Sequence, residues 1–136
     1  MRYVDTNFFI RPLTNDDPVK ARACEDVLQK VDRGEAEITT CEAIISEVAY
    51  ILSSRATYGM SHAEIRARFA PYLRMRGLRL AGKSVYLEAL DLFAANPALD
   101  FEDTLCVAHM RQARITEILS YDRHLDRIPG IRRIEP

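Results

Sequence analysis

The chain alternates short apolar runs with longer amphipathic segments, and this alternation limits its possible folds more than any other feature. Strands are expected at residues 2–5, 36–39, 78–81, 117–120 and 131–134. Segments between them repeat apolar residues at helical spacing. Strands that alternate with helices predict an α/β domain, with a mostly parallel sheet covered on both faces. Sites in such folds lie beyond the carboxyl ends of the strands.

Local signals set the ends of the expected helices. Asp17-Pro18 provides a cap and a first-turn proline for a helix that ends at Gly34. Ser61 and Glu64 form a capping-box pattern at the start of another helix. Helices are accordingly expected at residues 8–13, 17–34, 41–55, 61–76, 84–95 and 100–114.

Size and composition predict one domain over residues 1–136. The chain is 48% hydrophobic, enough for one core, and contains no linker that would divide it. An acid at position five argues against a signal peptide, and no apolar stretch approaches the roughly 20 residues of a membrane span. We therefore expect a cytoplasmic protein that does not bind membranes. The cysteines, Cys24, Cys41 and Cys106, are expected to be small core residues.

Positive charge is concentrated in the middle of the chain, although the net charge is −1. Residues 53–83 carry seven basic side chains and one acid, Glu64, which leaves +6. This segment is interpreted either as a solvated helical face or as a flank that contacts phosphates beside an acidic pocket.

Two acids directly follow apolar strands and are candidates for a shared site. Asp5 comes where the first strand ends, and Thr6 and Asn7 add groups that could orient a carboxylate or a water. Asp122 follows the strand at 117–120 in the same way, and Asp126 is an alternative one helical turn later. We expect these two strands to be neighbours, although each acid can instead be a helix cap.

Two further acids lie toward the inner side of expected helices. Glu47 borders the apolar stripe through Ile44 and Val48, so its carboxylate must be paired, bind a metal or reach the surface. Asp103 lies on an inward face of its helix. Asp103 is also the third residue after the expected N-cap Asp100, where the helix dipole stabilises a negative charge.

Carboxylates that share a pocket repel one another, and a bound cation relieves that repulsion. Asp5, Glu47, Asp103 and Asp122 therefore predict a site for Mg²⁺ or Mn²⁺, which take oxygen ligands and meet phosphate substrates readily. We expect Asp5 and Asp103 to be direct ligands, and Glu47 and Asp122 to act through water or on a second metal. The expected reaction is attack of water on a phosphodiester.

Four segments resemble the PIN-domain family, and most closely its VapC-type toxins. They are Tyr3-Val4-Asp5-Thr6-Asn7, Ser46-Glu47-Val48, Asp100-Phe101-Glu102-Asp103-Thr104-Leu105 with Ala108, and Leu119-Ser120-Tyr121-Asp122-Arg123-His124-Leu125. Their order and spacing match the family over nearly the whole chain. Tyr121 and His124 depart from it, because many relatives have less bulky or acidic residues there.

The resemblance implies a three-layer α/β/α fold around a central, mostly parallel sheet. It implies an endoribonuclease that depends on Mg²⁺ or Mn²⁺ and is the toxin of a type II toxin–antitoxin pair. Its acidic set falls on Asp5, Glu47, Asp103 and Asp122, and Ser120 falls near the pocket. A homodimer and a small antitoxin protein that blocks the site are further implications.

Two other functions are weighed against this one. A catalytically inert PIN-like module that binds nucleic acid or protein would be favoured by a missing acid, and none is missing. An aspartate-based phosphotransfer enzyme would use Asp5 as nucleophile, but Asp5-Thr6-Asn7 lacks the Asp-x-Asp of dehalogenase-like phosphatases. Histidine chemistry is not expected: His109 is interpreted as a core residue, and His124 as a surface turn residue that could touch the site.

Overall fold

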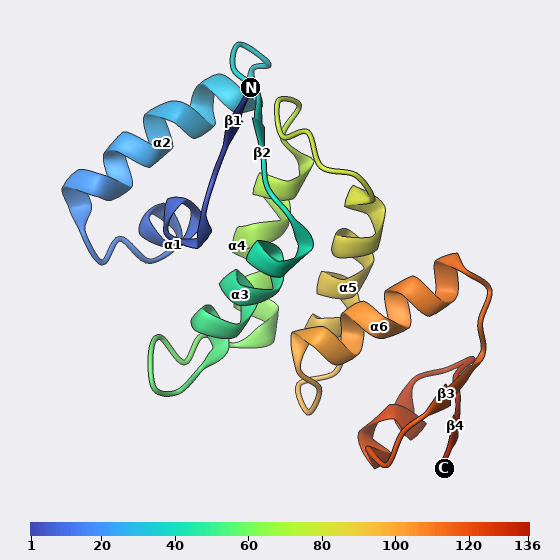
Figure 1. Ribbon diagram of the computed structural model, residues 1–136. Coiled ribbons are helices and arrows are strands. Elements are labelled where there is room, and N and C mark those ends of the chain that lie inside the picture. Colours follow the sequence, from blue (N-terminus) through green and yellow to red (C-terminus); the bar gives the residue numbers. More distant parts are fainter.

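The computed structural model describes all 136 residues, which form six α-helices, one short 3-10 helix and four strands (Figure 1). The strands are β1 (Arg2–Tyr3), β2 (Ile38–Thr39), β3 (Glu117–Leu119) and β4 (Arg132–Ile134). The helices are α1 (Thr6–Thr14), α2 (Pro18–Asp32), α3 (Glu42–Ser53), α4 (His62–Arg74), α5 (Lys83–Ala95), α6 (Phe101–Gln112) and the 3-10 helix η1 (Arg123–Arg127). Each expected helix is present, within a few residues of its predicted ends.

The strands pair in parallel, as predicted for an α/β fold. β1 pairs with β2, with Tyr3 opposite Thr39, and β3 pairs with β4, with Ile118 opposite Arg133. The strand expected at 78–81 is reduced to a single parallel bridge between Ile38 and Leu78. The chain leaves the sheet soon afterwards, and Gly82 adopts a left-handed conformation (φ 71°) as the N-cap residue of α5.

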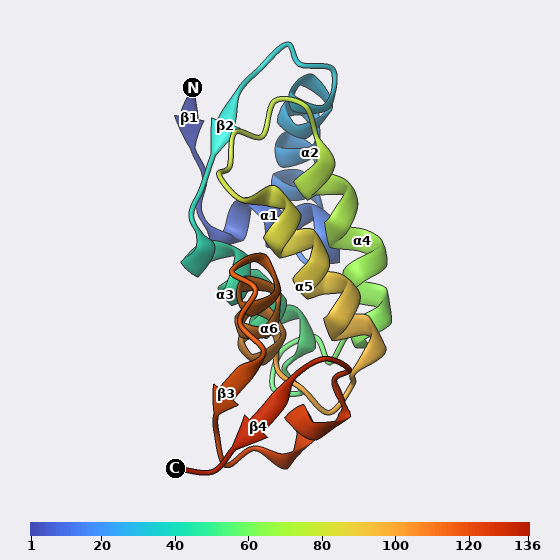
Figure 2. The ribbon, with the colours of Figure 1, turned by 90° about the vertical axis from the view of Figure 1, so that its right-hand side faces the viewer.

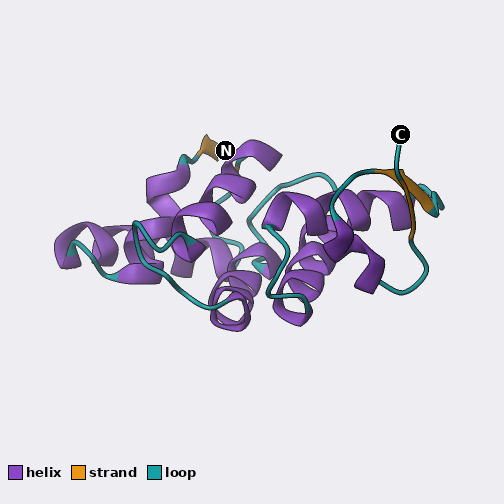
Figure 3. Cartoon of the chain, turned by 90° about the horizontal axis from the view of Figure 1, so that it is seen from below, coloured by secondary structure: helices purple, strands orange, loops and turns teal.

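The two strand pairs form separate two-stranded sheets. The β1–β2 pair lies near the N-terminus, and the β3–β4 pair lies near the C-terminus at the other end of the molecule, with α3 and α6 between them (Figure 1 and Figure 2). The view from below also separates the C-terminal strands from the N-terminal strand (Figure 3). The expectation that the first strand neighbours the strand before Asp122 is therefore wrong for this structure.

A single cluster of 29 buried hydrophobic residues joins the helices. Phe9 of α1 and Phe69 of α4 are fully buried and meet edge to face, with ring centroids 5.6 Å apart. Phe93 of α5 is also fully buried and meets Phe101 of α6 in the same way. These aromatic contacts link α1 to α4 and α5 to α6.

The C-terminal strands are anchored to this core by the segment between them. Leu125 and Ile128 are buried and belong to the same hydrophobic cluster. Their burial fixes the position of β3 and β4 against the rest of the chain.

The fold bears on two further expectations. No helix is both long and apolar enough to cross a membrane. The prediction that all three cysteines are core residues is wrong: Cys41 and Cys106 are exposed, and Cys24 is partly exposed. Cys41 precedes α3 as its N-cap residue, and Cys106 lies on the outer side of α6.

Candidate active site

Asp5 lies directly after β1 and is the N-cap of α1. Its backbone is extended (φ −95°, ψ −178°), and its side chain accepts a hydrogen bond from the Phe8 amide at 3.1 Å. One carboxylate oxygen therefore stabilises the helix start. The carboxylate is exposed, so it can serve as a cap and still bind a ligand.

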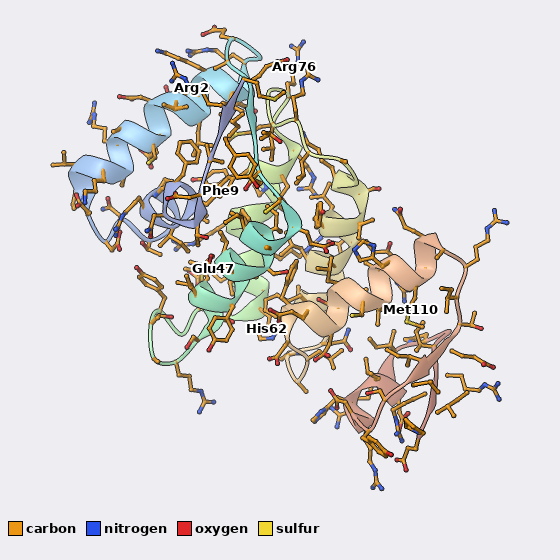
Figure 4. The ribbon with its side chains drawn as sticks, in the orientation of Figure 1. Arg2, Phe9, Glu47, His62, Arg76 and Met110 are labelled. Carbon is orange, nitrogen blue, oxygen red and sulfur yellow. The ribbon has the colours of Figure 1, made fainter.

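Glu47 of α3 points toward the start of α1, next to Asp5. The hydroxyl of buried Thr6 donates a short hydrogen bond of 2.5 Å to Glu47 Oε2. Figure 4 shows Glu47 on the side of α3 that faces α1. The helix pattern predicted that Glu47 borders the buried stripe. Its hydrogen-bond partner is Thr6, which the sequence pattern indicated only as a neighbour of Asp5.

A cavity of about 410 Å³ opens beside Asp5, between α1 and α2. Its lining comprises Asp5, Asn7, Phe8, Arg11, Lys20, Ala23 and Cys24. Burial, followed by the negative charge of Asp5, raises the pKa of the Cys24 thiol. The cavity thus places two basic side chains and the Asn7 amide around an exposed carboxylate.

Asp103, at the start of α6, and Asp122, at the start of η1, form a second acidic pair. Asp103 lies in the first turn of α6, where its Oδ2 accepts a hydrogen bond from the backbone amide of the N-cap Asp100 at 3.3 Å. Burial raises the pKa of Asp103, and the negative charge of Asp122 raises it further. Asp122 is thus one of three acids, with Asp100 and Glu102, whose negative charge acts on Asp103.

Asp122 is the N-cap of η1 and is held by His124. Its Oδ1 accepts hydrogen bonds from the His124 backbone amide at 3.0 Å and from the His124 ring nitrogen Nδ1 at 2.8 Å. These contacts, the backbone one first, lower the pKa of Asp122. Ser120 holds the backbone of Asp122, because its Oγ accepts a hydrogen bond from the Asp122 amide at 3.0 Å.

Asp126, the alternative to Asp122, has a different partner. Its carboxylate binds the Arg133 guanidinium at 2.9 Å. Arg133 also binds Glu135, so Asp126 belongs to an ion-pair network between η1 and β4. Of these two acids, Asp122 is the one whose negative charge acts on Asp103.

The four candidate acids thus form two pairs, Asp5 with Glu47 and Asp103 with Asp122. No group of three or more acids, histidines or cysteines in the structure is arranged to hold a metal ion. The pairs stay apart because β3 pairs only with β4, so that Asp122 does not reach the edge of the sheet where β1 delivers Asp5.

Of two histidines near the candidate acids, one differs from its predicted role. His109 is exposed and binds Glu42 of α3 at 2.6 Å, so the prediction of a core residue is wrong. His124, expected as a surface turn residue that could touch the site, contacts Asp122 directly. Its position two residues after Asp122, in a turn, was the signal available in the sequence.

The basic segment at residues 53–83 is partly neutralised. Arg66, Arg68 and Arg79 form ion pairs with Asp91, Glu64 and Glu37 respectively. The remaining basic residues of the segment form no ion pair and carry its excess positive charge; they are Arg55, Arg74, Arg76 and Lys83.

Comparison with models of known protein families shows which family the chain belongs to. The model of the PIN domain matches residues 2–131, nearly the whole length. The chain belongs to the PIN domain family. PIN domains are generally nucleases, and the α/β architecture with parallel strands is that of the family. No curated protein matches the chain.

Proposed function

We propose that this PIN domain is a metal-dependent endoribonuclease that hydrolyses RNA phosphodiester bonds, and that it acts as the toxin of a type II toxin–antitoxin pair. The observation that carries the proposal is the environment of Asp103 at the start of α6, where burial, followed by the negative charge of Asp122, raises the pKa of this carboxyl group. Carboxylates held close enough to repel each other favour a bound cation. Family membership supplies the nuclease fold around them.

The chemistry of the donor set fits a hard divalent cation, Mg²⁺ or Mn²⁺, because all four acids offer carboxylate oxygens. Because the two pairs lie apart in this structure, each would offer its own position for a cation, Asp103 with Asp122 and Asp5 with Glu47. When bound, such a cation supplies a water of lowered pKa and stabilises the charge that develops on the phosphate.

The residues around the acids have separate tasks in this proposal. Thr6 orients Glu47, and His124 and Ser120 orient Asp122. Arg11 and Lys20 line the cavity beside Asp5 and would attract the RNA backbone. The unpaired arginines of α4 and the loop after it extend the positive surface for a polyanion.

A catalytically inert PIN-like binding module is the second candidate. The separation of the four acids into two pairs favours it. An inert module would bind RNA without cleaving it, so that binding and cleavage assays together distinguish the two functions.

Cleavage of mixed RNA by the purified chain, with Mg²⁺, Mn²⁺ or EDTA, tests the proposal. We expect cleavage with either cation and none in EDTA. Equal cleavage in EDTA, or RNA binding with no cleavage under any condition, would refute the metal-dependent nuclease. For the toxin role, we expect that expression stops growth and that co-expression of a small protein encoded beside this gene restores it.

A further inference from the structure

A second cavity, of about 390 Å³, opens at the end of the β1–β2 pair that lies away from Asp5. Its walls come from the start of β1, the last turns of α2 and the segment that leads into β2. Four charged side chains line it: Arg2, Lys30, Glu35 and Glu37. Figure 4 shows Arg2 near the start of β1, away from Glu47. The cavity is therefore separate from the candidate active site at the carboxyl end of β1.

The hydrogen-bond acceptors on the wall of this cavity already have partners. Glu35 forms an ion pair with Arg33 at 2.9 Å, and Glu37 forms one with Arg79 at 2.7 Å. The carbonyl of Lys30, in the last turn of α2, accepts two backbone amide hydrogen bonds. No acceptor among these groups is left for a bound cation.

The cations on the wall have no such partners. Arg2 and Lys30 are exposed, and neither forms an ion pair. Arg76 adds a third unpaired cation at this end: its guanidinium carbon lies 3.8 Å from the position that a Cβ on Gly34 would take. Unpaired positive charges gathered around one concave surface attract an anion.

The segment that carries Arg76 is held in place by Gly77. The Gly77 amide donates a hydrogen bond to the Val31 carbonyl at 2.9 Å. A Cβ at this position would collide with the Ala36 carbonyl oxygen, so only glycine allows the close approach. Backbone contacts thus fix Arg76 at this end of the molecule.

The rest of the cavity wall is apolar. Val27 and Ala36 are half-buried, and Ile38 is buried in the core. The volume lies within the range of sites for small molecules. Arginine and lysine bind phosphate oxygens through charge-assisted hydrogen bonds. Cations beside an apolar wall fit a phosphate group that is joined to an uncharged body.

We propose that this cavity binds a phosphomonoester with a nucleoside body. The phosphate lies between Arg2 and Lys30, and the nucleoside contacts Val27 and Ile38. A free nucleoside monophosphate and the 5′-phosphate end of an RNA strand share this chemistry. The site goes beyond the proposed nuclease function, because binding here involves none of the four candidate acids.

Calorimetric titration with adenosine 5′-monophosphate tests the site in EDTA, so that no cation recruits the nucleotide to the acidic pairs. We expect the nucleotide to bind, inorganic phosphate to bind more weakly, and adenosine not to bind. Arg2→Gln and Lys30→Gln should each weaken nucleotide binding by about 10-fold. Arg55→Gln is the matched control, because Arg55 is an exposed, unpaired arginine in the loop after α3, and it should bind as the wild type does.

Glu35→Gln tests the sign of the charge that the cavity prefers. The substitution releases Arg33 from its ion pair, so nucleotide binding should be unchanged or tighter, whereas a cation site would lose affinity. Thermal melts confirm that each variant is folded. No binding of the nucleotide by the wild type, equal weakening by Arg55→Gln and Arg2→Gln, or loss of binding in Glu35→Gln would overturn the proposal.

A short RNA with either a 5′-phosphate or a 5′-hydroxyl group distinguishes the two sources of the phosphate. Tighter binding of the phosphorylated RNA, with this preference lost in Arg2→Gln, supports an RNA end as the ligand. Equal binding of the two RNAs by a chain that binds the mononucleotide supports a free nucleotide. Equal binding of the two RNAs without mononucleotide binding contradicts the site, and metal-dependent RNA cleavage by the same chain would leave the nuclease function standing.

Discussion

Thr6 donates its hydroxyl to Glu47, 41 positions away in the sequence, and so ties α3 to the start of α1 beside Asp5. Thr6 is buried, whereas both acids next to it are exposed. The hydrogen bond therefore connects the hydrophobic core to the acidic site. A residue that fixes a carboxylate in this way commonly affects metal affinity and activity without touching the substrate.

Thr6→Val tests this role. The substitution keeps the shape of the side chain but removes the hydroxyl, so Glu47 loses its partner. We expect RNA cleavage to fall about 10- to 100-fold. Thr6→Ser should retain most of the activity. Thr14→Val is the matched control, because the Thr14 hydroxyl binds backbone groups and none of the four candidate acids: it donates to the Ile10 carbonyl and accepts from the Asp16 amide. Equal cleavage by Thr6→Val and Thr14→Val would contradict a positioning role.

Asp122 and Asp126 should differ in importance. Asp122 lies near Asp103, so Asp122→Asn should reduce cleavage by about 100-fold or more. Asp126 is bound to Arg133, so Asp126→Asn should keep cleavage near the wild-type rate and lower stability by at most about 1 kcal/mol. Single-turnover rates and thermal melts of both variants check this prediction. A larger loss of cleavage in Asp126→Asn than in Asp122→Asn would show that Asp126, and not Asp122, completes the acidic site.

The raised pKa of Asp103 predicts a stability effect with a defined sign. A carboxyl group whose pKa is higher in the folded state costs stability when it ionises, as the pH rises through its ordinary pKa. Asp103→Asn removes that cost and keeps an oxygen for the Asp100 amide. In EDTA we therefore expect the variant to melt above the wild type at pH 7, by about 2 °C because the group is partly exposed.

The same comparison at low pH is the control for Asp103. At about pH 3 the carboxyl is largely protonated in both folded and unfolded chains, so the two melting temperatures should converge. A variant that melts below the wild type at pH 7 would mean that Asp103 stabilises the fold as a capping residue.

Much of the fold could be predicted from the sequence, because its signals are local. Asp17-Pro18 and the Ser61 capping box mark helix starts that the structure contains. The parallel pairing of strands also follows from their alternation with helices. The neighbour of each strand could not be predicted, since it depends on long-range packing, here the burial of Leu125 and Ile128.

The candidate site, like the fold, could be predicted only in part. The motifs identified each acid, but not its partner: the bonds from Thr6 to Glu47 and from His124 to Asp122 depend on side-chain orientation. Asp5 and Asp103 were expected in one cluster, whereas the structure holds them in separate pairs. No local pattern encodes the separation of the two sheets, which determines that outcome.

The most direct test of the account compares Asp5→Asn with Asp17→Asn in the metal-dependent RNA cleavage assay. Both acids cap a helix in the same way, accepting an amide hydrogen bond at 3.1 Å, and asparagine caps equally well. We predict that Asp5→Asn lowers cleavage by at least about 100-fold. Asp17→Asn should cleave at the wild-type rate, and both variants should melt as the wild type does. Undiminished cleavage by Asp5→Asn would show that Asp5 is only a helix cap and would contradict the proposed active site.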